Sequence, residues 1–120
     1  MSYDFLMLKT SVPIDSQHDL SEDIVLVQAP EKVMAELSRL LPGLSWGKCF
    51  GGFFWEALTE DEEGQYELHV PLEPSQSWSI RTSHRRGKRD LVARICKSLG
   101  VVAFDGQAML LIDERGERPA

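Results

Sequence analysis

The chain has three histidines and two cysteines, the side chains that most often bind transition metals or act as nucleophiles. They are widely separated in sequence, at His18, Cys49, His69, His84 and Cys96. None belongs to a Cys-x-x-Cys or His-x-x-x-His pair, the spacing that places two ligands on one ion. A nucleophilic Cys49 would need a histidine or a helix amino terminus beside it, and its sequence neighbours are apolar. The spacing therefore predicts no metal, no cofactor and no catalytic site, and leaves the reactivity of Cys49 open.

Four consecutive acids occupy residues 60–63. Adjacent carboxylates in a turn are solvated, which suits acid–base catalysis poorly, so they form either a solubilising turn or a patch that binds basic side chains of a partner. Upstream, a strand over roughly residues 53–58 would place Phe54 and Glu56 on one face. Phe54 would there be a core residue or an exposed anchor for a partner. The predicted partner-binding residues are Phe54, Glu56, Glu60, Asp61, Glu62 and Glu63.

A basic cluster lies between residues 81 and 89 and offers an alternative site for nucleic acid. Its members are Arg81, His84, Arg85, Arg86, Lys88 and Arg89. No aromatic side chain that could stack on a base is interleaved with them after Trp78. A solvated corner between a strand and a helix, partly neutralised by nearby acids, is the favoured interpretation of this cluster.

Charge is distributed unevenly along the chain, which has a formal net charge of −6. Residues 1–80 have a net charge of −10, whereas residues 81–120 have a net charge of +4. An acidic surface repels nucleic acid and attracts a basic protein. The charge pattern therefore favours a protein partner over nucleic acid.

The spacing of apolar residues predicts two helices. Pro30 suits the first position of a helix, and apolar residues at Val33, Leu37 and Leu40 repeat with helical spacing until residues 42–43, Pro-Gly, end it. A second helix is expected from about residue 87 or 88 to Leu99, followed by a glycine cap. Strands are expected at residues 3–8, 53–58, 66–70, 78–82, 101–104 and 109–112, with a short one at 24–27 and a frayed tail at 114–120.

This order predicts a single α+β domain over residues 1–120. We expect a two-layer sandwich with a mainly antiparallel sheet of four to six strands and two amphipathic helices on one face. The apolar fraction of 42% is that of a globular protein, and no run approaches the roughly 20 apolar residues of a membrane helix. The first nine residues have an acid, Asp4, where a secretory signal has a basic start, so we expect a cytoplasmic protein without a membrane partner.

Both ends of the chain resemble a known group of proteins. Residues 1–4, Met-Ser-Tyr-Asp, open a predicted strand, and residues 99–105, Leu-Gly-Val-Val-Ala-Phe-Asp, follow the last helix. This arrangement resembles small bacterial α+β proteins that include toxin-immunity proteins. The resemblance implies a cytoplasmic, non-enzymatic protein that covers the active site of a cognate toxin. A nucleic-acid-associated regulator that uses the basic cluster is the alternative.

Overall fold

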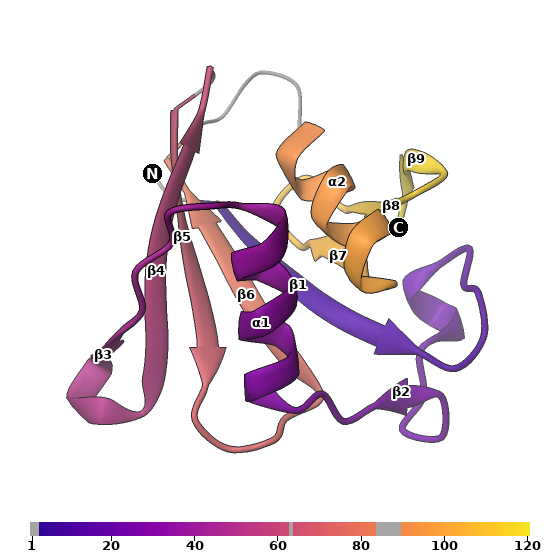
Figure 1. Cartoon of the computed structure of the whole chain (residues 1–120). Coiled ribbons are helices and arrows are strands. Elements are labelled where there is room, and N and C mark those ends of the chain that lie inside the picture. Colours follow the sequence, from indigo (N-terminus) through magenta and orange to yellow (C-terminus); the bar gives the residue numbers. More distant parts are fainter. Residues whose placement is uncertain (1–2, 63, 84–89) are drawn as a thin grey trace.

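The computed structural model describes residues 3–62, 64–83 and 90–120. These residues form two α-helices, two short 3-10 helices and nine strands (Figure 1). In chain order they are β1 (Tyr3–Thr10), η1 (Gln17–Asp19), β2 (Val25–Leu26), α1 (Pro30–Leu40), β3 (Gly47–Cys49), η2 (Phe50–Gly52), β4 (Phe54–Asp61), β5 (Gly64–Pro71), β6 (Ser77–Thr82), α2 (Asp90–Leu99), β7 (Val102–Asp105), β8 (Leu110–Asp113) and β9 (Gly116–Pro119).

The strands make one antiparallel sheet in the order β3-β4-β5-β6-β1-β7-β8-β9, and β2 pairs with the end of β1. The predicted α+β class is confirmed, but the expected four to six strands are too few. β3 and β9 are the strands that the sequence did not indicate. Both are short, and β9 (Gly-Glu-Arg-Pro) has no apolar alternation to reveal it, so it forms by pairing with β8.

The two helices lie on the same side of the sheet (Figure 1). α1 begins at Pro30, as predicted, and buries Val33 and Leu37 against the sheet. α2 buries Leu91, Val92, Ile95 and Cys96. It ends at Leu99, and the expected cap follows: Gly100 has a left-handed φ of 67°, and the Val101 amide donates to the Cys96 carbonyl at 3.1 Å. The apolar stripes thus place both helices on one face.

The main core lies between the helices and the sheet, and a second, smaller cluster lies on the opposite side. Side chains that alternate along the central strands fill the main core, among them Phe5, Met7, Leu68 and Ile80, each no more than 1% exposed. The second cluster comprises Leu8, Ile14, Val102 and Leu111. This cluster lies beneath the segment between β1 and β2, and in the part of the chain that the structure describes no comparable cluster covers the far face of β4, β5 and β6.

The end of the chain is ordered, so the predicted frayed tail at residues 114–120 is wrong. Arg118 and Arg115 each place an Nη2 atom near Asp113 Oδ2, at 3.0 and 3.1 Å, and both donate to the carbonyl of Ile14. Ser16 also donates its hydroxyl to the Ala120 carbonyl at 2.8 Å. Ionic contacts therefore hold this largely polar segment, and Ala120 packs against the second cluster. No helix among the described residues is both long enough and apolar enough to cross a membrane.

Candidate functional site

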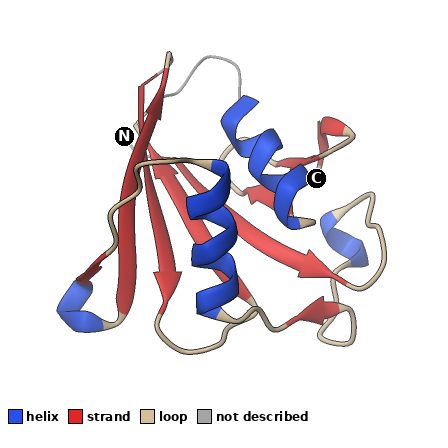
Figure 2. Ribbon diagram, in the orientation of Figure 1, coloured by secondary structure: helices blue, strands red, loops and turns tan. Residues whose placement is uncertain are grey.

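Among the described residues, no α-helix covers one face of the sheet over β4, β5 and β6. Figure 2 shows both α-helices on the same side of the strands. Burial alternates along β6, where Trp78, Ile80 and Thr82 are buried and the residues between them are half-buried. We call the uncovered side the open face; its described residues include Asp4, Leu6, Phe54, Glu56, Leu58, Glu60, Glu67, Ser79 and Arg81.

The open face exposes large apolar side chains. Leu58 is 55% exposed at the middle of β4, and Leu6 is 40% exposed on β1. At the edge of the sheet, the connection between β3 and β4 exposes Phe50 and Phe53 by 58% and 73%. Leu58 and Leu6 are separated by β5 and β6, so these side chains add apolar area at separate points of the face and at its edge.

The open face is acidic among the residues described. It carries Asp4, Glu56, Glu60 and Glu67 against the arginine Arg81. The Arg81 Nε donates to Asp4 Oδ1 at 3.0 Å, and this contact raises the pKa of Arg81 above its ordinary value. Asp4 and Arg81 therefore satisfy each other, and the carboxylates on β4 and β5 leave the face with a negative potential.

The predicted acidic patch at residues 60–63 is divided by the hairpin. β4 continues to Asp61, which pairs with Gly64, so the strand ends three residues later than expected. Glu60 lies on the open face, whereas Asp61 has the opposite orientation and accepts a hydrogen bond from the Gly64 amide at 3.2 Å. Glu62 is exposed in the turn, and Glu63 lies outside the described residues. The described acids do not form one continuous patch.

Phe54 and Glu56 share the open face, as predicted from alternation. Phe54 is half-buried, because the Phe50 ring packs edge-on against it with centroids 5.8 Å apart. The exposed aromatic side chains at this edge are therefore Phe50 and Phe53. Of the predicted nucleic-acid residues, only Arg81 is described; His84, Arg85, Arg86, Lys88 and Arg89 lie outside the described residues.

Three potential metal ligands meet at the edge of the open face: Cys49, Glu56 and His69. The Sγ, a carboxylate oxygen and a ring nitrogen lie within 4.8 Å of one another. The His69 Nε2 is 2.8 Å from Glu56 Oε2 and 3.6 Å from Glu67 Oε1. His69 is 5% exposed although it lies on the helix-free side of the sheet. The sequence spacing predicted no such convergence.

Phe50 is the residue that buries His69. Its ring packs on the imidazole with centroids 5.2 Å apart. Phe50, Gly51 and Gly52 all have positive φ, of 52°, 71° and 87°, so the chain folds back over the sheet directly after Cys49. Phenylalanine rarely adopts this conformation, and such strained residues concentrate at functional sites.

Cys49 is not activated as a nucleophile in this arrangement. Partial burial raises the pKa of its thiol, and the nearby carboxylates of Glu56 and Glu67 raise it further. A catalytic cysteine needs the opposite environment, one that favours the thiolate. Cys96 is buried in the core, which raises its pKa to about 12.

The convergence follows from strand register, which the sequence only partly indicates. Because Asp61 pairs with Gly64, Glu56 lies directly opposite His69, and β3 then adds Cys49 beside Phe54. The sequence did contain one indication of this tight turn, the glycine at position 64 directly after the acidic residues. The fold-back at residues 50–52 carries no comparable signal, because glycines beside aromatic residues indicate only a bend.

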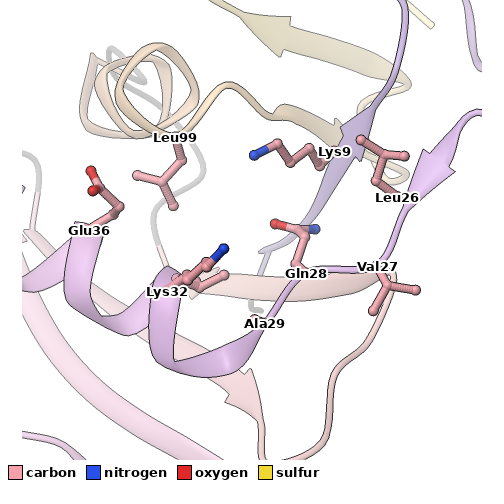
Figure 3. Close-up of a pocket in the computed structure, with 9 residues that line it drawn as sticks. Lys9, Leu26, Val27, Gln28, Ala29, Lys32, Glu36 and Leu99 are labelled. Atoms are coloured by element: carbon pink, nitrogen blue, oxygen red, sulfur yellow. The ribbon is translucent and has the colours of Figure 1, made fainter.

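A groove of about 260 Å³ opens on the helix side, between α1, β2 and the end of α2. Lys9, Lys32 and Glu36 carry charged groups at its rim, and Leu99 points into it (Figure 3). Gln28 in its wall is structural, because it accepts from Trp78 Nε1 at 3.0 Å and donates to the Met7 carbonyl. The described lining has no histidine and no cysteine, and its charged groups are the amines of Lys9 and Lys32 and the carboxylate of Glu36.

Comparison with protein-family models, with curated proteins and with solved structures gave no match to this chain.

Proposed function

We propose that this chain is a non-enzymatic bacterial immunity protein that acts in the cytoplasm and binds a cognate toxin domain through its open face. The observation that carries the proposal is the pairing, on one helix-free face, of exposed leucines with an excess of carboxylates. Leu6 and Leu58 supply apolar area, and Glu56, Glu60 and Glu67 supply the charge. A partner that covers this face would bury the leucines and exclude water from the carboxylates.

The negative charge of the open face favours a positively charged protein as the partner. A surface with four acids and one paired arginine attracts a positively charged protein and repels the phosphates of nucleic acid. Toxin domains that act on nucleic acids carry basic surfaces around their active sites, because those surfaces bind phosphates. A protein that covers such a site needs a negative surface, which is what β4 and β5 provide.

The open face extends over several strands. It spans β4, β5, β6 and the start of β1, and the exposed Phe50 and Phe53 lie at its edge. Aromatic residues at the rim of a charged face are common anchors in protein interfaces.

The test is binding to the polypeptide encoded by the gene adjacent to this one, with inhibition of that polypeptide's toxicity as a second readout. We expect the Glu60→Lys, Glu67→Lys double variant to bind at least about tenfold more weakly, a loss of about 1.4 kcal/mol or more. The matched control is Glu22→Lys, Glu31→Lys, which makes the same charge change outside the open face. Equal affinity for both double variants would contradict the proposal.

Binding to nucleic acid in place of a protein is the other possible result of these binding experiments. Binding to RNA or DNA that weakens steeply with salt, and no binding to the adjacent gene's product, would favour the regulator that uses Arg81 and the basic cluster. The contact between Arg81 and Asp4 favours the protein partner, because it removes one cation from that cluster.

A further inference from the structure

We propose that Cys49, Glu56 and His69 bind a divalent metal ion of the zinc class. The argument for this metal site rests on the donor atoms at the edge of the sheet and needs no partner protein, although Glu56 also belongs to the open face. The three side chains come from three adjacent strands: Glu56 on β4 lies directly opposite His69 on β5, and Cys49 at the end of β3 pairs with Phe54, two residues before Glu56.

The donor set selects the metal. Sulfur, imidazole nitrogen and carboxylate oxygen together are typical ligands of Zn²⁺, whereas Mg²⁺ and Ca²⁺ prefer oxygen alone. A thiolate and a carboxylate would balance the charge of a divalent ion. With three protein ligands, the fourth tetrahedral position would hold water. Glu67 lies 3.6 Å from the His69 nitrogen and adds negative charge beside the ion.

The geometry needs only small changes to bind an ion. With metal–ligand bonds of about 2.0–2.3 Å, two ligands of one tetrahedral ion lie roughly 3.3–3.8 Å apart. The donor atoms already lie within 4.8 Å of one another, and Glu56 and His69 are in hydrogen-bond contact at 2.8 Å. Rotation of the half-buried Cys49 and Glu56 side chains would bring the three donor atoms to the separations found around a tetrahedral ion. Their partial exposure also gives an ion a path from solvent.

The backbone beside Cys49 is a second, independent observation. Phe50 has a left-handed φ of 52°, which is uncommon for a residue other than glycine, asparagine or aspartate. The conformation places the Phe50 ring on the imidazole and restricts its orientation. Metal-binding histidines are held in one orientation by their surroundings, and an apolar cover lowers the local dielectric around the ion. The strained turn therefore does what a metal site requires.

A plain ion pair or a thiol active site at these three residues would behave differently from a metal site. In an ion pair, Glu56 and His69 stabilise each other and Cys49 is a bystander. In a thiol active site, Cys49 would be unusually reactive. Only the metal site predicts that Cys49 and His69 act together on a bound ion.

The experiment is titration of the untagged, reduced and chelator-treated protein with Co²⁺, followed by competition with Zn²⁺. Cobalt is the probe because a thiolate ligand gives a charge-transfer absorption that Zn²⁺ abolishes on displacement. We expect one equivalent of Co²⁺ to produce this absorption. Cys49→Ser should abolish it, and Glu56→Gln and His69→Gln should each weaken binding by at least about tenfold. Cys96→Ala and His18→Gln are the matched controls and should bind as the unmodified protein does.

Alkylation gives a second readout that does not depend on the buried histidine variant folding. Zn²⁺ should protect Cys49 from iodoacetamide, measured by mass spectrometry, and Cys49 in Glu56→Gln should lose that protection. No thiolate absorption with Co²⁺, or absorption that survives Cys49→Ser, would overturn the proposal. Alkylation of Cys49 at the same rate with and without Zn²⁺ would also overturn it.

Discussion

Replacing Asp113 by asparagine tests whether ionic contacts hold the end of the chain in the sheet. Asp113 is the last residue of β8, and its side chain is 14% exposed. Its Oδ2 lies 3.1 Å from an Nη atom of Arg115 and 3.0 Å from one of Arg118. Asparagine keeps the shape and one acceptor oxygen but removes the charge. The change therefore isolates the electrostatic contribution to β9.

The size of the effect follows from the exposure of each partner. Hydrogen bonds to charged groups contribute about 1.5–3 kcal/mol when they are shielded from water, and exposed ion pairs contribute about 0–1 kcal/mol. The Arg118 side chain is 20% exposed and belongs nearer the first class, whereas Arg115 is 46% exposed and belongs to the second. We expect Asp113→Asn to lower the free energy of unfolding by about 2 kcal/mol. For a chain of this length, that corresponds to a fall in Tm of roughly 8 °C.

The effect should depend on pH with a defined sign. Burial raises the pKa of Asp113, but the hydrogen bonds from Arg118 and Arg115 outweigh burial and hold the pKa below its ordinary value. A carboxyl group with a lowered pKa stabilises the fold above its ordinary pKa of about 3.9, and that stabilisation is lost as the pH falls through the folded-state pKa. The difference in free energy of unfolding between the unmodified protein and Asp113→Asn should be largest at neutral pH and should become smaller below about pH 4.

Urea unfolding at about pH 7 and about pH 3 measures this difference. Asp15→Asn is the control, because Asp15 contacts Arg115 at 3.1 Å but its side chain is 85% exposed, so its loss should cost less than about 1 kcal/mol. A cost for Asp113→Asn that does not change with pH, or one no larger than that of Asp15→Asn, would refute the reasoning.

Three further substitutions test other parts of the structure. Gln28→Ala should cost about 1–3 kcal/mol and change the fluorescence of Trp78, because it leaves the buried indole N–H without its acceptor. Gly100→Ala should lower the urea midpoint by the equivalent of about 1 kcal/mol, because the left-handed φ of 67° strains any other residue even though a Cβ meets no neighbour. Leu68→Ala should cost about 2–5 kcal/mol while Leu58→Ala stays within about 0.5 kcal/mol, since Leu68 is fully buried and Leu58 is 55% exposed; equal costs in thermal unfolding would mean that the assigned sheet faces are wrong.

The helices and the central strands could be predicted because their apolar residues follow a clear period. α1 begins at Pro30 as expected, and α2 ends with Gly100 in the expected left-handed cap. Alternation also placed Phe54 and Glu56 on the same face of β4. These features depend on local sequence, which is where periodicity and turn chemistry are informative.

The edges of the sheet and the Cys49 cluster could not be predicted, because both depend on pairing between distant residues. β9 has no apolar pattern and is held by Arg118. His69 alternates with the core residues of β5 and so lies on the open face, yet the fold-back at Phe50 covers it. Periodicity gives the face of each side chain but not the segment that later folds over that face.

Amide chemical shifts of the isotope-labelled protein, recorded with and without the polypeptide encoded by the adjacent gene, test most directly whether the open face binds a basic protein. We predict changes concentrated at Leu58, Glu60 and Glu67 on β4 and β5 and at Phe53 beside them, with few on α1. Changes concentrated on α1 and around the groove lined by Lys32 and Leu99, with β4 and β5 unaffected, would contradict the proposed function.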